Sequence, residues 1–299
     1  MKQFAATAVL IGACLSSVAN SADFQSDYIA VAKQGDGLDV VLLHGFASSS
    51  DVWKDVTDQL NNRFALHLVQ VAGFAGVPAP DKAPSNYLDT IRDEVLRYLE
   101  EQKLDAPTLV GHSMGGFTSI RVAAKSPERV GRVIVVDSLP FFSLIFNPSA
   151  TVELVAPQAK AMEQVLIAQN ETQFAEQAKR SIAILTKQQT KRELALQWSN
   201  ASDRRVYAQF LRELMTHDAR SELKTIRCPV TVIYPFDEGA NVTEDRVRGL
   251  YRTAYTDLDG VRLHGIADSF HFIMWDQPET FLNTLNAVLP ASSKPPSEN

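Results

Sequence analysis

Short apolar runs alternate with amphipathic stretches along most of the chain. Seven of these runs are candidate strands, at residues 28–33, 39–43, 64–71, 107–110, 133–136, 230–234 and 261–266. The first of the seven is a candidate edge strand. Apolar runs bounded by turn residues are typical of strands that a parallel sheet buries on both faces. Helical spacing follows at 52–60, 87–103, 117–125, 244–255 and 278–288. The alternation predicts an α/β fold with a doubly wound, mainly parallel sheet and right-handed crossovers.

This rhythm breaks between about residues 141 and 223, where no good strand occurs. The stretch is rich in Ala, Gln, Glu, Lys and Leu and predicts three or four helices, the clearest at 152–169, 172–186 and 203–216. We interpret residues 140–223 as a helical lid inserted into a core made of residues 23–139 and 224–290. The polar, Pro-rich tail at 291–299 is expected to be disordered.

The segment Gly111-His112-Ser113-Met114-Gly115 stands between a predicted strand and a predicted helix. In that context Gly-x-Ser-x-Gly is typical of a nucleophile elbow, with the Ser113 hydroxyl exposed on a sharp turn. Gly111 and Gly115 lack a Cβ and therefore permit such a turn. A phosphate-binding turn at the helix start is the alternative, but no Lys follows as in a P-loop.

A serine hydroxyl becomes a good nucleophile only when a base takes its proton. Of the six histidines, His271 follows the last predicted strand. Residues past the carboxyl ends of parallel strands share one edge of the sheet, so His271 should lie on the same edge as Ser113, and we predict that it is the base. The other five are expected to have other roles. His112 adjoins the serine, and His44 belongs to the His-Gly-Phe loop. His67 and His264 are expected to pack within strands, and His217 lies in the link from lid to core.

The imidazole in turn needs a carboxylate that fixes its tautomer. Asp237 follows the 230–234 run through a Pro-Phe turn and is the preferred candidate. Asp137, at the end of the 133–136 run, is the alternative, and it could instead brace the start of the lid. Glu238, next to Asp237, is a more distant choice.

Two backbone N–H groups are expected to form an oxyanion hole. One belongs to Met114, directly after the nucleophile, and the other to Phe46, in the loop after the 39–43 strand. The side chains of Phe46 and Met114 would line the acyl site.

Composition and the N-terminus bear on the location of the protein. The 299 residues are 45% hydrophobic and 21% charged with a net charge of −6, which is ordinary for a soluble protein and argues against nucleic acid as a partner. Lys2, an apolar stretch at 4–15 and small residues at 19–21 predict that residues 1–22 are a secretory signal peptide, cleaved after Ser21 or Ala22, rather than a transmembrane anchor. We therefore expect an exported protein, periplasmic or secreted. A lipoprotein signal that ends at Cys14 is the rival interpretation, and Cys228 is expected to be a small buried side chain.

Together these pieces resemble the α/β-hydrolase family, in particular its lid-bearing serine esterases and lactonase-like members. The matching segments are Leu42-Leu43-His44-Gly45-Phe46, the elbow, Cys228-Pro229-Val230 leading to Asp237, and His271 ahead of Trp275-Asp276-Gln277-Pro278-Glu279. The resemblance implies an eight-stranded core with the lid after the sixth strand, and a triad of Ser113, Asp237 and His271. One departure is residues 71–76, where family members often carry an acidic residue and this chain has Val71.

A serine at the elbow favours acyl transfer over the epoxide and halide chemistry of relatives that carry Asp there. The sequence thus predicts an exported serine hydrolase that cleaves an ester or lactone of a small, apolar acyl substrate. The same triad could serve a C–C bond or amide hydrolase, and a non-catalytic ligand-binding protein is the alternative of another class. No metal motif is found and the chemistry needs no cofactor. Aromatic residues at helical spacing in the lid are expected mainly to pack the lid on the core (Phe174, Trp198, Tyr207, Phe210).

Overall fold

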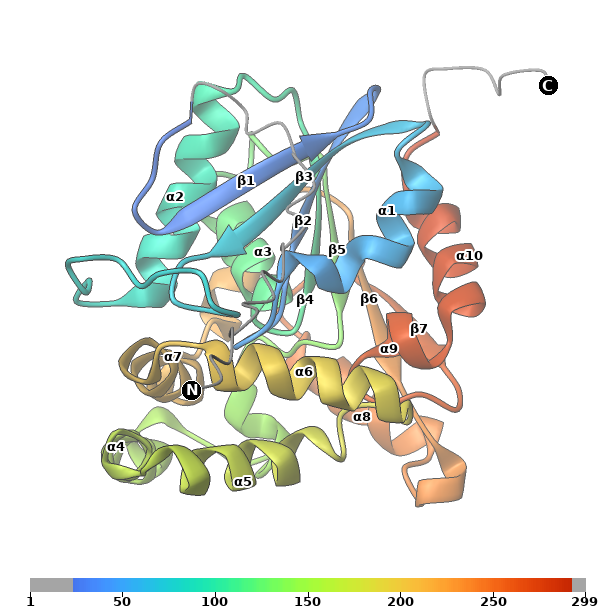
Figure 1. The fold of residues 1–299 in the computed structure, drawn as a ribbon. Coiled ribbons are helices and arrows are strands. Elements are labelled where there is room, and N and C mark those ends of the chain that lie inside the picture. The colour runs from blue at the N-terminus through green and yellow to red at the C-terminus, as the bar shows by residue number, and fades with distance from the viewer. Residues whose placement is uncertain (1–23, 292–299) are drawn as a thin grey trace, which may run out of the picture.

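A seven-stranded sheet forms the centre of the computed structural model, which describes residues 24–291 (Figure 1). The strands are β1 (Ile29–Gln34), β2 (Leu38–Leu43), β3 (Phe64–Val71), β4 (Thr108–His112), β5 (Arg132–Val136), β6 (Val230–Pro235) and β7 (Arg262–Ile266). Their order is β1-β3-β2-β4-β5-β6-β7, and only β1 runs antiparallel to its neighbour. The predicted fold class is therefore confirmed. The described sheet has seven strands where the resemblance implied eight, so the lid follows the fifth of them rather than the sixth.

Helices cover both faces of the sheet, which explains why its central strands read as continuous apolar runs. One face carries the 3₁₀ turn η1 (Ser50–Trp53), α1 (Lys54–Leu60), α9 (Ile273–Asp276) and α10 (Pro278–Val288). The other carries α2 (Tyr87–Glu101), α3 (Met114–Lys125) and α8 (Glu244–Ala254). Every residue of β4 is buried. The strand that leads to the serine therefore lies in the middle of the sheet with a hydrophobic core on each side.

The lid consists of four helices between β5 and β6, as its composition predicted. They are α4 (Val152–Ala168), α5 (Glu171–Ile182), α6 (Gln189–Ala201) and α7 (Arg204–Thr216). Figure 1 shows α6 and α7 nearer the core, with α4 and α5 outside them. The side chains of Thr151, Asn170 and Asp203 cap three of these helices. The N-cap of α6, Gln188, accepts no such bond, and α6 is the lid helix whose range the sequence did not predict.

Three further 3₁₀ turns connect these parts: η2 (Phe142–Ile145), η3 (Arg220–Thr225) and η4 (Glu238–Ala240). The proposed signal peptide, Cys14 and the tail beyond residue 291 lie outside the described residues. Between residues 24 and 291, no helix has the length and apolarity that crossing a membrane requires.

Candidate active site

Ser113 occupies a strained turn between β4 and α3. Its φ of 54° and ψ of −119° lie outside the regions that L residues favour. Its N–H donates to the Val136 carbonyl of the neighbouring strand at 2.9 Å, and its side chain is partly exposed. A Cβ on Gly111 would overlap the Gly115 backbone, and one on Gly115 would overlap the Leu43 carbonyl oxygen. Both glycines are therefore sterically required, as a nucleophile elbow predicts.

The loop after β2 lies directly against this elbow. A Cβ built on Gly45 would be 3.2 Å from the Ser113 Cβ, so Phe46, the next residue, begins its turn beside the serine. Met114 is the first residue of α3, where backbone N–H groups have no partner within the helix. The two expected oxyanion donors thus belong to a loop and a helix start that the structure brings together.

His44 holds the shape of that loop. Its Nδ1–H donates to the Gly45 carbonyl oxygen at 2.7 Å, and its Nε2 accepts the Val71 N–H at 3.0 Å. Burial lowers the pKa of His44 to about 4, although its bond to the Gly45 carbonyl acts in the opposite direction. The ring is therefore neutral near pH 7, which leaves Nε2 free to accept the Val71 N–H.

His271 and Asp137 form the central polar pair of the site. The His271 Nδ1–H donates to Asp137 Oδ2 at 2.5 Å, with the two side chains 23% and 17% exposed. A carboxylate can only accept here, so Nδ1 carries the proton and Nε2 is left able to take another. The predicted base is thus paired with Asp137, which the sequence analysis held as the alternative.

Asp237, the preferred carboxylate, makes other contacts, and the structure corrects that pairing. Asp237 Oδ2 lies 2.5 Å from Lys187 Nζ of the lid, and Oδ1 accepts the Ala240 N–H at 3.2 Å. The Lys187 ammonium holds the pKa of Asp237 below its usual value. The chain after β6 turns at once into η4, which directs this carboxylate toward Lys187, in the segment between α5 and α6. Glu238, in the same turn, is exposed.

His112 adjoins the catalytic candidates without competing for the proton. Its Nε2–H donates to the His271 carbonyl oxygen at 3.0 Å, and the two rings lie 4.4 Å apart. Burial, followed by the proximity of His271, lowers the pKa of His112 well below its usual value. His112 is therefore a neutral support for the His271 loop.

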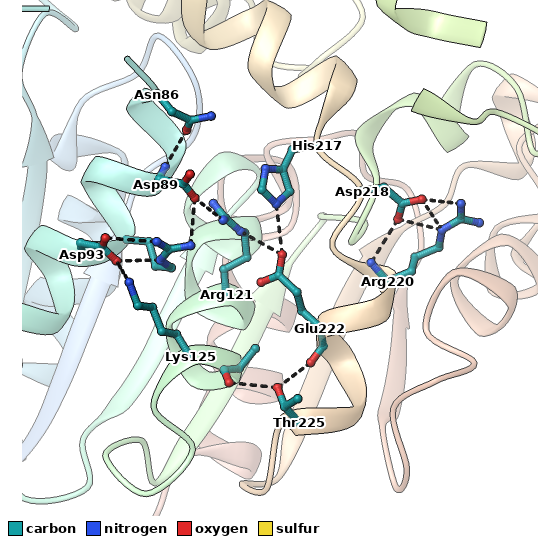
Figure 2. A network of polar contacts seen from close by, with 12 residues as sticks. Asn86, Asp89, Asp93, Arg121, Lys125, His217, Asp218, Arg220, Glu222 and Thr225 are labelled. Atoms are coloured by element: carbon teal, nitrogen blue, oxygen red, sulfur yellow. Dashed lines mark hydrogen bonds and ion pairs between the residues drawn. The ribbon is translucent and has the colours of Figure 1, made fainter. Parts of the chain in front are cut away.

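The contacts of the three remaining histidines involve other residues than His271 and Asp137. His67 is buried and contacts Asp39 at 2.8 Å, whereas His264, expected to pack within the sheet, is exposed. His217, in the link from lid to core, has its Nε2 3.1 Å from Glu222 Oε1, within the polar network that Figure 2 shows between α2, α3 and η3. This network fastens the end of the lid to the core.

One lid aromatic reaches the elbow region. The rings of Tyr207 on α7 and Phe46 lie 4.4 Å apart. Phe210 packs against Phe74 of the core, and Trp198 against Trp275. Lid-to-core packing thus accounts for most of the lid aromatics, while Tyr207 places an apolar ring next to the expected oxyanion loop.

Several contacts in this region had no clear sequence signal. The Tyr251 hydroxyl on α8 donates to Asp137 Oδ1. The segment between α5 and α6 is tied to the His271 loop through Asp276, whose Oδ1 accepts the Thr186 hydroxyl at 2.6 Å and the Lys187 N–H at 2.9 Å. Tyr251 and Tyr255 are spaced four residues apart, which indicates a shared buried face but not the partner. Among the described residues, no group of three or more His, Cys, Asp or Glu could hold a metal ion.

Comparison with known proteins places this geometry in a family. The model described as "Alpha/beta hydrolase family" matches residues 40–284. A pimeloyl-[acyl-carrier protein] methyl ester esterase from Nitrosomonas europaea is 35% identical over 114 residues, 38% of this chain and 42% of that protein. A human (lyso)-N-acylphosphatidylethanolamine lipase is 33% identical over 138 residues, 45% of this chain and 40% of that protein. The matches thus span about two fifths of these relatives.

Solved structures match over far more of the chain. The enol-lactonase from Burkholderia xenovorans LB400 has a TM-score of 0.69 at 18% identity, and the match covers 87% of this chain and 95% of that one. A thermophilic esterase from Thermogutta terrifontis has a TM-score of 0.70 at 20% identity, with 87% and 92% covered. At these identities the likeness establishes the fold.

Proposed function

Because the chain belongs to the alpha/beta hydrolase family, we propose that it is a serine hydrolase that cleaves a carboxylic ester or lactone with Ser113, His271 and Asp137. The observation that carries the proposal is the His271–Asp137 hydrogen bond on the sheet edge where the strained Ser113 turn stands. Together these contacts supply a nucleophile, a base with a fixed tautomer and a carboxylate that steadies the imidazolium.

The reaction proceeds in two halves. His271 Nε2 takes the Ser113 proton as the hydroxyl oxygen attacks the ester carbonyl, and the imidazolium then gives the proton to the departing alcohol oxygen. Water attacks the acyl-enzyme in the same way, with His271 as base, and releases the acid and free Ser113. The Asp137 carboxylate stays ionised throughout and stabilises the imidazolium of each step.

The oxyanion of each tetrahedral intermediate is stabilised by the N–H groups of Phe46 and Met114. Both are backbone donors, fixed before the substrate arrives by the His44 contacts and by the start of α3. Preorganised donors need no rearrangement as the charge develops, which is the basis of their effect on rate.

An apolar acyl group suits the surroundings of the serine. Phe46 stands between Phe74 of the core, 5.5 Å away, and Tyr207 of the lid. The names of the relatives, a methyl ester esterase and an acyl-lipid lipase, support an ester substrate with an acyl chain.

We also propose that the N-terminal leader directs export of the protein, which N-terminal sequencing of the mature protein would test.

The proposal is tested with the chain from Asp23 onward and its Ser113→Ala variant. Hydrolysis of p-nitrophenyl esters from acetate to palmitate should fall on the order of 10³-fold or more in the variant, and a fluorophosphonate should label only the wild type. The acyl chain length that is hydrolysed fastest then indicates how long an acyl group the site accommodates. Equal activity in both proteins would refute the role of Ser113. A wild type that the fluorophosphonate labels but that hydrolyses none of these esters would have another substrate, and lactones, amides and diketones would be assayed next.

A further inference from the structure

Three tyrosines form a stack behind the Asp137 carboxylate. The Tyr234 and Tyr251 rings lie 5.2 Å apart and nearly parallel, and the Tyr251 and Tyr255 rings lie 6.4 Å apart. Tyr234 comes from β6, Tyr251 from α8, and Tyr255 is the residue that directly follows α8. All three side chains are buried. Phenol hydroxyls in such a core need partners, and their partners differ.

The middle tyrosine contacts Asp137 itself. The Tyr251 hydroxyl donates to Oδ1, while the His271 Nδ1–H donates to Oδ2. The Tyr255 hydroxyl instead donates to the backbone carbonyl of Ser138 at 2.8 Å. Two buried phenols, one on α8 and one directly after it, thus bond adjacent residues of the same loop, and only Tyr251 bonds to the carboxylate.

We propose that Tyr251 is a positioning residue of the hydrolase: its hydroxyl fixes the Asp137 carboxylate in the orientation that accepts the His271 Nδ1–H. The inference rests on the proposed function, because Asp137 acts there through His271. A carboxylate held at only one oxygen can rotate about its Cβ–Cγ bond. A donor on the second oxygen stops that rotation and spreads the negative charge over both oxygens.

The phenol keeps its proton while it does this. Burial, and then the negative charge of Asp137, raises the pKa of Tyr251 well above its usual value. Tyr251 therefore remains a donor at every pH at which the enzyme would work.

Replacement by Tyr251→Phe removes the donor and keeps the ring. Asp137 Oδ1 then loses its partner in a partly buried place, and the negative charge shifts toward Oδ2, which faces the imidazolium. His271 should hold its proton to higher pH, so the acid limb of the kcat/KM profile should move up by about half a pH unit to one unit. We expect kcat to fall on the order of tenfold with KM nearly unchanged, because Tyr251 lies behind the site.

Other charged and titratable groups stay the same in the variant. Neutral His112 faces the His271 ring from β4, and the Lys187–Asp237 pair lies beside the same loop. At the far end of the stack are the charges that face Tyr234 (Glu244, Arg248 and Arg252). A shift seen on replacing the single hydroxyl of Tyr251 can thus be assigned to that hydroxyl.

Tyr255→Phe is the matched control, because it removes a buried hydroxyl from the same stack without touching Asp137. We would measure kcat and KM against pH, thermal stability, and the downfield NMR resonance of the His271 Nδ1 proton in both variants. The proposal predicts that Tyr251→Phe moves the pH limb and the resonance, whereas Tyr255→Phe changes stability alone. Unmoved values in Tyr251→Phe, or equal shifts in both variants, would overturn it.

The two proposals fail in different ways. Absence of turnover that depends on Ser113 would refute the hydrolase function, and the NMR resonance would still show whether Tyr251 orders the Asp137–His271 pair. Normal Ser113-dependent turnover with an unaltered Tyr251→Phe profile would refute only the positioning role. Were Tyr251→Phe to unfold at the assay temperature, the same pH profile and His271 resonance would be recorded at a lower temperature at which it is folded, with the same expected shifts.

Discussion

Acid should weaken the fold through His44, the residue that shapes the loop after β2. Its pKa falls from 6.5 in the unfolded chain to about 4 in the folded protein because it is buried. A group with a lowered folded pKa contributes its full stability above the unfolded value and loses it as the pH falls toward the folded value. Between about pH 7.5 and pH 5 the unfolded chain gains almost one proton at this site and the folded protein gains almost none. The linked loss of unfolding free energy is about 2 kcal/mol.

The test compares the wild type with His44→Gln, whose amide oxygen can still accept the Val71 N–H and does not titrate in this range. Urea unfolding at the two pH values would be followed by tryptophan fluorescence and by circular dichroism, whose coincidence checks two-state behaviour. Buried His112 adds a loss of the same sign and buried Glu213, whose pKa burial raises, opposes it. Both contributions cancel when the variant is subtracted from the wild type.

The variant should be less stable at both pH values, because an amide whose oxygen accepts the Val71 N–H has no group at the Nδ1 position to donate to the Gly45 carbonyl. Its unfolding free energy should nevertheless fall by about 2 kcal/mol less than that of the wild type between the two conditions. If both proteins lost equal stability, His44 would have to be protonated in the folded state or exposed, and the argument from burial would be refuted.

Two further predictions concern the carboxylates and the elbow. Asp137→Asn should lower kcat for ester hydrolysis by about 10³-fold or more. Asp237→Asn loses only the Lys187 contact, so its kcat should stay within about threefold of the wild-type value. The reverse order in the same steady-state assay would restore Asp237 as the triad residue. Gly115→Ala should cost about 3 kcal/mol of unfolding free energy or more, because its Cβ would overlap the Leu43 carbonyl. The control is Gly249→Ala in α8, where nothing lies within 4 Å of the new Cβ and no loss is expected in a urea titration.

The local pattern was enough to predict the strained turn at Ser113, the place of His271 at the same edge of the sheet, and the helices of the lid. Each depends on neighbours in sequence: glycines on both sides of Ser113 between a strand and a helix, a histidine directly after the last strand, and a long stretch with helical spacing and no strand. Strand and helix positions followed for the same reason, since β3 and α10 coincide with their predicted ranges.

The choice between Asp137 and Asp237 depended on the tertiary structure. Both follow the carboxyl ends of adjacent parallel strands, β5 and β6, so their sequence contexts are nearly equivalent. What separates them is the path of the chain afterwards: η4 and Lys187 engage Asp237, while Tyr251 arrives from α8 to hold Asp137 toward His271. Lys187 and Asp237 are 50 residues apart in sequence, and Tyr251 and Asp137 are 114 apart. The sequence by itself determined which residues reach this edge of the sheet, and only the packing of distant helices decided which carboxylate meets the imidazole.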